Sequence, residues 1–257
     1  MSLSITTELP CITEAGKTVM TTVTNYGYRL YTLNLLKSLV PFGLDQSLLI
    51  LCLDNKVAEY FESRGYRVAR SEQNMERFCP WNTEGYDKIC YMKLEWIYRI
   101  LSSGKNVLLV DGDIVFQKDP IEEIRQWERN EGQDVWIQND HPSDEDTRNL
   151  CTGFMFIRST PRMIQLYDCV SSDGQEKYKV CAFLNNDQSY FNQFVKPYCH
   201  VYVLPLQVYP NGQVFYSATE QIRPTAIMVH FNWVCGHAKM AKMKEHKMWL
   251  LTEDEES

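Results

Sequence analysis

The stretch V-L-L-V-D-G-D-I-V-F, from Val107 to Phe116, places two carboxylates, Asp111 and Asp113, at the end of an apolar run. A short apolar run of this kind is typical of a strand that is buried on both faces, as in a parallel sheet. An unpaired carboxylate is costly to bury, and two carboxylates one residue apart also repel each other. We therefore expect a cation beside this pair, and a divalent metal ion is the obvious candidate.

A second D-x-D pattern, from Asp144 to Asp146, occurs in the polar stretch H-P-S-D-E-D-T. No apolar strand precedes this copy, so we interpret it as a solvated loop. The motif alone has little specificity. The apolar run before Asp111 and Asp113 is therefore what distinguishes them from the second pattern.

Apolar runs of strand length alternate with helical patterns along the first half of the chain. T-V-M-T-T-V-T at 18–24 is β-rich, 47–54 is a continuous apolar run, and 86–103 has one apolar helical face that ends before Gly104. This alternation predicts an α/β fold with a mostly parallel central sheet and flanking helices. The second half mixes in antiparallel pieces, with strands expected at 134–139, 152–158, 200–205 and 226–232 and a helix at 186–195.

Composition excludes several classes of protein. A chain of 257 residues with 44% hydrophobic and 23% charged residues and a net charge of −7 is an ordinary globular protein, not a nucleic-acid binder. We see no signal peptide and no apolar run that could cross a bilayer, and nine scattered cysteines indicate reduced thiols. We therefore predict a soluble, cytoplasmic protein that forms one domain over 1–257, with a frayed acidic tail at 252–257.

Three polar segments follow three of the expected strands. They are Thr24-Asn25-Tyr26, Asp111-Gly112-Asp113 and His230-Phe231-Asn232. Ligands of α/β sheets bind beyond the carboxyl ends of the strands, so we expect these segments to converge on one site. A lone histidine at the end of an apolar strand, as His230 is, is more often a satisfied polar core residue than a ligand.

The segment that follows His230 suggests a phosphate site. Gly236 and Lys239 precede a helix that carries further lysines. Glycine lets the backbone approach a phosphate closely, and lysine supplies a point charge. A solvated basic helix face is the alternative interpretation, but the nearby carboxylates favour a diphosphate clamp.

Together these segments resemble a known family. T-N-Y-G-Y, Y-M-K-L on a helix, V-L-L-V-D-G-D-I-V-F, C-T-G-F-M-F-I-R-S-T, D-Q-S-Y-F-N and H-F-N occur in this order. The set is similar to the nucleotide-diphospho-sugar transferases related to plant xylosyl- and arabinosyltransferases, which have the Rossmann-like GT-A fold. The resemblance spans about 18–245. Similar compact enzymes are encoded by large algal viruses, which would place the protein in the host cytoplasm.

The resemblance implies a metal-dependent glycosyltransferase. It would move a pentose or hexose from a nucleotide-sugar donor, with a UDP-sugar as the first choice, to a hydroxyl of an oligosaccharide or other glycan. Asp113, Asp111 and His230 would hold Mn²⁺ or Mg²⁺. The implied donor-binding residues are Thr24, Asn25 and Tyr26 at the base and ribose, Lys93, Asp111 and Gly112, Thr152 and Gly153 at the sugar, and Gly236 and Lys239 at the diphosphate. In glycogenin-like members the glycine lies closer to the histidine than Gly236 does here.

The resemblance also places Asp187 and Gln188 beside the sugar or the reacting carbon. In an inverting enzyme Asp187 would serve as the general base, and in a retaining enzyme it would orient the donor. Asp140 is the reserve candidate for the base. Asp187 could also be a simple helix cap.

Other functions fit the sequence less well. D-G-D-I-V also matches the nucleophile motif of haloacid-dehalogenase-type phosphatases, in which Asp111 would attack a phosphate. That family usually has the motif near its N-terminus and a second acidic motif further on. A nucleotidylyltransferase would need a glycine-rich loop after the first strand, and a binding module would leave the carboxylate pair without a purpose.

Overall fold

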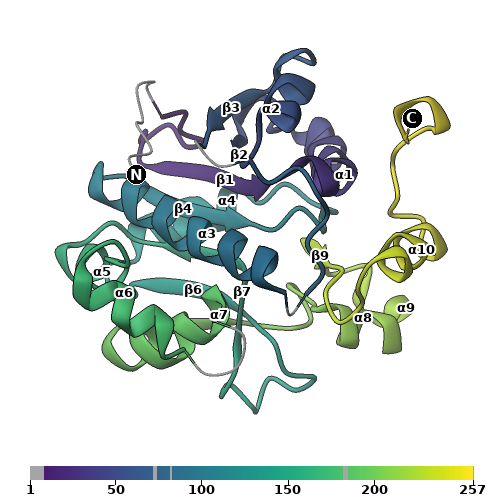
Figure 1. Cartoon of the computed structure of the whole chain (residues 1–257). Coiled ribbons are helices and arrows are strands. Elements are labelled where there is room, and N and C mark those ends of the chain that lie inside the picture. Colours follow the sequence, from purple (N-terminus) through teal and green to yellow (C-terminus); the bar gives the residue numbers. More distant parts are fainter. Residues whose placement is uncertain (1–8, 72–73, 82, 182–184, 257) are drawn as a thin grey trace.

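The computed structural model describes residues 9–71, 74–81, 83–181 and 185–256. A seven-stranded sheet forms its centre (Figure 1). In sheet order the strands are β3 (Arg67–Arg70), β2 (Leu49–Cys52), β1 (Thr18–Thr24), β4 (Asn106–Val110), β7 (Leu150–Ile157), β6 (Val135–Asn139) and β8 (Val201–Leu204).

Strand direction decides which residues meet at the edge of this sheet. β1 is parallel to β2 and β4, and β6 is parallel to β8, whereas β7 is antiparallel to both β4 and β6. The mostly parallel, mixed sheet predicted from the sequence is therefore confirmed. As a result, the carboxyl ends of β1, β4 and β6 lie at the same edge as the amino end of β7.

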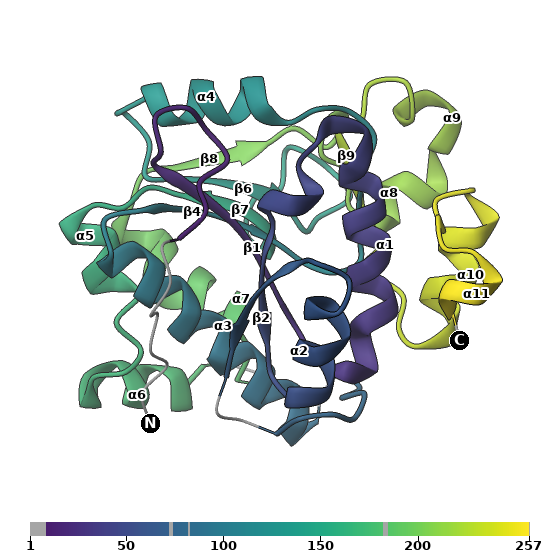
Figure 2. The same cartoon turned by 90° about the horizontal axis from the view of Figure 1, so that it is seen from above.

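Helices cover both faces of the sheet (Figure 2). Alternate strand residues point to opposite faces: Val107 packs in the cluster that contains α3, and Leu108 packs in the cluster that contains α1, α2 and α4. The helices are α1 (Arg29–Leu39), α2 (Asn55–Glu62), α3 (Glu84–Ser102), α4 (Ile121–Arg129), α5 (Pro161–Leu166), α6 (Ser172–Lys179), α7 (Asp187–Tyr190), α8 (Gly212–Ser217), α9 (Thr219–Ile222), α10 (His237–Glu245) and α11 (Glu253–Glu256).

A second, two-stranded sheet lies beside the carboxyl end of β4. It pairs β5 (Ile114–Phe116) with β9 (Met228–His230) in antiparallel fashion, with Ile114 opposite His230. The chain turns between β4 and β5, where the Ile114 amide donates to the Asp111 carbonyl at 3.1 Å. The 226–232 strand therefore lies outside the central sheet, contrary to our expectation, because this turn directs β5 away to form its own pair.

The acidic C-terminal segment is ordered. α11 carries Glu255, whose carboxylate lies 2.5 Å from Lys37 Nζ, and Glu256, which lies 2.9 Å from Lys244 Nζ. The Trp249 indole also donates to Glu256 at 2.7 Å. The prediction of a frayed tail is therefore wrong for residues 252–256, because two lysines and an indole provide partners for its carboxylates.

Across the described ranges, no helix combines the length and the apolar character that crossing a bilayer requires.

Candidate active site

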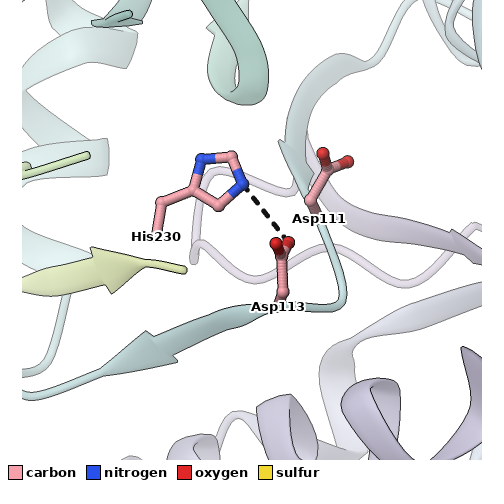
Figure 3. A group of neighbouring side chains, drawn as sticks. All are labelled: Asp111, Asp113 and His230. Carbon is pink, nitrogen blue, oxygen red and sulfur yellow. Dashed lines mark ion pairs between the residues drawn. The ribbon is translucent and has the colours of Figure 1, made fainter. Parts of the chain in front are cut away.

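Two carboxylates and one imidazole converge at the sheet edge. The candidate ligand atoms of Asp111, Asp113 and His230 all lie within 4.8 Å of one another (Figure 3). Asp111 follows β4, Asp113 precedes β5, and His230 ends β9, so the β4–β5 turn and the β5–β9 pairing bring the three together. Carboxylate oxygens and an imidazole nitrogen are suitable ligands for Mn²⁺ or Mg²⁺. These residues therefore fit the predicted metal.

Asp113 is the buried anion between two cations. His230 Nε2 lies 3.2 Å from Asp113 Oδ1, and the Lys239 ammonium forms an ion pair with Oδ2. Burial alone would lower the pKa of His230, but the neighbouring Asp113 raises it to about 10. Burial alone would raise the pKa of Asp113, but Lys239 and His230 hold it well below its usual range. These two side chains thus supply positive charge of the kind that the carboxylate pair requires.

Lys93 forms a second charged centre next to the first. Its Nζ atom lies 2.8 Å from both Asp111 Oδ1 and Asp187 Oδ2. Thr152 Oγ1 also donates to Asp187 Oδ2, at 2.6 Å. Burial alone would raise the pKa of Asp187, but Lys93 lowers it overall. Asp187 is thus a buried counter-ion of Lys93, and it does not serve as a side-chain cap of its helix, because Asn186 caps α7.

Gln138 on β6 fixes the orientation of His230. Its side-chain Nε2 donates to the carbonyls of Tyr209 at 3.1 Å and Pro210 at 3.0 Å, so its Oε1 must face His230 Nδ1, 2.7 Å away. Nδ1 therefore carries a proton and Nε2 faces Asp113. Such outer partners of a metal-ligating histidine set its tautomer. Gln138 was not among the residues predicted for the site, although a polar residue after the apolar run Val135–Ile137 is visible in the sequence.

Gly153 on β7 makes room for the cluster. A Cβ atom at this position would lie 2.2 Å from His230 Cε1 and 2.8 Å from Asp111 Oδ2. A larger residue would therefore displace two of the three candidate ligands. Gly112, in the turn between the two aspartates, is also tightly placed, because a Cβ atom there would lie 3.0 Å from Thr32 Oγ1.

A third group of polar residues lies at the end of β6. Asp140 accepts hydrogen bonds from Gln188 Nε2 at 2.8 Å, Asn149 Nδ2 at 3.1 Å and Asn232 Nδ2 at 3.2 Å. Burial raises the pKa of Asp140. Gln188 and Asp140 are therefore direct partners, while Asp187 faces Lys93.

The side chains of the segment after β1 form more hydrogen bonds within the protein than we expected. Thr24 Oγ1 accepts from Thr32 Oγ1 at 2.8 Å, and Asn25 Nδ2 donates to the Arg77 carbonyl at 2.8 Å. Both side chains are buried. Two cations lie over the Tyr26 ring, with Lys56 Nζ 3.9 Å and the Arg29 guanidinium carbon 4.2 Å from the ring centroid. The role of this segment in binding base and ribose stays a prediction, and it would depend on backbone atoms or on Tyr26.

Gly236 has a positive φ of +55° just before α10, and its carbonyl accepts from Tyr31 Oη at 3.1 Å. Three residues later Lys239 reaches Asp113, so the predicted diphosphate clamp lies beside the candidate metal ligands.

Comparison with known proteins identifies the family. The family model of nucleotide-diphospho-sugar transferases matches residues 43–245. The chain belongs to this family. A UDP-galactose:fucoside alpha-3-galactosyltransferase of Dictyostelium discoideum is 28% identical over 90% of this chain and 43% of its own length. A UDP-D-xylose:L-fucose alpha-1,3-D-xylosyltransferase of Arabidopsis thaliana is 22% identical over 66% of this chain and 52% of its own. The chain thus spans about half the length of these relatives.

Solved structures show the same fold. A glycosyltransferase involved in glycosylation of the major capsid of PBCV-1 covers 90% of this chain and 99% of its own, with a TM-score of 0.53 and 12% identity. The bifunctional glycosyltransferase WbbM covers 87% of this chain and 47% of its own, with a TM-score of 0.56 and 13% identity. The GT-A fold expected for the chain is therefore confirmed, and the phosphatase alternative finds no support.

Proposed function

We propose that the protein is a metal-dependent glycosyltransferase that moves a pentose or hexose from a UDP-sugar to a glycan hydroxyl. The observation that carries the proposal is the cluster of Asp111, Asp113 and His230, with two lysines against it, on a fold of this family. Relatives named for UDP-galactose or UDP-D-xylose as donor and a fucoside or L-fucose as acceptor support it. We therefore propose O-3 of a fucose-bearing glycan as the acceptor, and 1–257 as a single catalytic domain.

Asp111, Asp113 and His230 would hold Mn²⁺ or Mg²⁺, which when bound neutralises charge on the donor diphosphate. Lys239, now the counter-ion of Asp113, would pair with the diphosphate as negative charge develops on it. Lys93 would contact the donor from the other side, held in place by Asp187. Because the Asp187 carboxylate is occupied by Lys93 and Thr152, we propose that it orients the donor and that transfer retains the anomeric configuration.

Calorimetry tests the metal and donor. UDP should bind with measurable affinity in Mn²⁺ and lose most of it in EDTA, and D113N should abolish the difference. Metal-independent binding would contradict the assignment.

A transfer assay tests the reaction. UDP-galactose and UDP-xylose are incubated with methyl α-L-fucopyranoside and Mn²⁺, and NMR of the first product identifies the linkage and its anomeric configuration. An aspartyl-phosphate on Asp111, found by mass spectrometry with a phosphate ester, would support the phosphatase instead.

A further inference from the structure

Trp233 is an exposed aromatic residue in a backbone conformation that large side chains rarely adopt. Its φ is +64°, and its side chain is 55% exposed. An ordinary bulky residue in the left-handed region is strained, and such strain persists only where the surroundings impose it. An exposed indole contributes little to the stability of the fold. The conformation therefore calls for another explanation.

The residues before Trp233 impose its position. Phe231 is fully buried, and the Asn232 side chain accepts from the Gly212 amide at 2.7 Å while it donates to Asp140 at 3.2 Å. The Asn232 carbonyl accepts from Tyr216 Oη at 3.0 Å. Asn232 is thus held through both its side chain and its carbonyl, and Trp233 is directed outward at a defined point.

At this point Trp233 contacts the polar group at the end of β6. Trp233 directly follows Asn232, whose side chain donates to Asp140 at 3.2 Å, and the indole lies close enough to Asp140 to hold the pKa of that carboxyl down against the effect of burial. Asp140 in turn accepts from Gln188, which follows the donor-side residue Asp187. The indole and these two polar side chains form one surface, which we call the Trp233 surface.

Sheet order places this surface relative to the donor. The strands β1, β4, β7 and β6 are consecutive neighbours. Along their shared edge they present Asn25 after β1, Asp111 after β4, Thr152 near the start of β7 and Asp140 after β6. The proposed nucleotide, metal and sugar positions occupy the first three places. The Trp233 surface occupies the fourth, on the far side of the sugar position from the nucleotide.

We propose that the Trp233 surface binds the acceptor sugar. The exposed indole would pack against an apolar face of the pyranose, and Asp140 and Gln188 would bind its hydroxyls. L-fucose suits such a surface because its methyl group enlarges its apolar side. This inference rests on the proposed function and adds the site of its acceptor.

The test separates acceptor binding from donor chemistry. W233G removes the ring and relieves the backbone, so folding should be preserved or improved. With UDP-galactose or UDP-xylose as donor, its KM for methyl α-L-fucopyranoside should rise by about tenfold or more, the scale of one lost aromatic contact. Hydrolysis of the UDP-sugar by water and UDP affinity in Mn²⁺ should stay within about twofold of wild type. The acceptor KM of W233F should lie between those of wild type and W233G.

Y202A, which removes an exposed ring from β8, is the matched control and should leave the acceptor KM unchanged. Direct binding provides a second readout: with UDP and Mn²⁺ present, the fucoside should change the Trp fluorescence of wild type but not of W233G. A wild-type KM in W233G would overturn the acceptor site while leaving the proposed function intact. If the wild type shows neither UDP binding nor hydrolysis but the fluorescence response remains, the proposed function fails and the sugar site stands.

Discussion

The ammonium group of Lys93 lies 2.8 Å from the Oδ2 atom of Asp187, and the two side chains are only 8% and 4% exposed. The same ammonium lies 2.8 Å from Asp111. Lys93 thus connects a candidate metal ligand just after β4 to the start of α7. Breaking a buried ion pair from one side leaves an uncompensated charge, so this contact concerns both stability and the position of a donor-binding group.

D187N should lower both stability and transfer. The neutral amide leaves Lys93 with one carboxylate partner, which should lower the free energy of unfolding by about 3 kcal/mol. Displacement of Lys93 should reduce transfer about 10²-fold, while UDP affinity changes by a few fold. Denaturant unfolding and initial rates check this. K93M is the partner variant in a double-mutant cycle, and additive effects of K93M and D187N would show that the pair does not interact.

Q138L should weaken metal binding in protein that is still folded. Without the Gln138 carbonyl oxygen, His230 Nδ1 loses the acceptor that fixes its tautomer, and the affinity for Mn²⁺ should fall about 10- to 100-fold. Titration of Mn²⁺ by electron paramagnetic resonance measures this directly. Q126L, on the exposed face of α4, is the control. Unchanged Mn²⁺ affinity in Q138L would limit the role of Gln138 to packing.

G153A should disturb the metal site more than its size suggests. The added methyl group would lie 2.2 Å from His230 Cε1, so His230 or the backbone of β7 must move. We expect a melting temperature lowered by several degrees, on the order of 1–3 kcal/mol for overpacking, together with loss of Mn²⁺-dependent UDP binding. G132A, in an exposed turn, should show neither effect. Normal UDP binding by G153A would mean that the cluster tolerates this displacement.

D113N should be less stable than wild type in the absence of metal, as well as inactive. Asp113 is the shared counter-ion of His230 and Lys239, so its neutralisation leaves two buried cations facing an amide. Calorimetric melting in EDTA should show the loss, and Mn²⁺ with UDP should stabilise wild type but not D113N. Equal melting temperatures of wild type and D113N in EDTA would contradict the role of Asp113 as counter-ion of His230 and Lys239.

His246 should make stability depend on pH. Its Nε2 atom is buried and has no hydrogen-bond partner among the described residues, and burial lowers its pKa below the usual 6.5. The unfolded chain therefore binds the proton more readily than the folded one, so stability falls as pH drops from about 6.5 to the lowered pKa and then levels off. H246F, which keeps the ring contacts, should flatten this part of the melting-temperature profile between pH 7 and pH 5. A parallel decline in both proteins would assign the effect to other groups.

The central sheet could be predicted because its strands are short apolar runs between turn residues, and Val107–Val110 is the clearest case. The position of 226–232 could not be predicted in this way. Its apolar pattern indicates a strand, but pattern alone does not say which strand it joins. That depends on the turn after Asp111, which directs β5 out of the central sheet to pair with β9.

The residues of the candidate site were likewise predictable from the sequence only in part. Carboxylates at the end of a buried strand need a positive partner, so Asp111 and Asp113 could be found from the sequence, and the structure brings His230 to them. The contacts of Asn25 and Gln138 could not be found, because each depends on backbone carbonyls that are distant in sequence. The frayed-tail prediction failed for the same reason, since Lys37 is remote from Glu255 in the chain.

The ion pair between Asp113 and Lys239 joins positions 126 residues apart, whereas every strand of the central sheet lies before residue 205. During synthesis on the ribosome, the sheet can therefore assemble while Asp113 still lacks both of its cations. The ion pairs of Asp113 with His230 and Lys239 can form only when β9 and α10 have emerged. A protease cut between β8 and β9 would place Asp111 and Asp113 on one fragment and His230 and Lys239 on the other without cutting any strand of the central sheet.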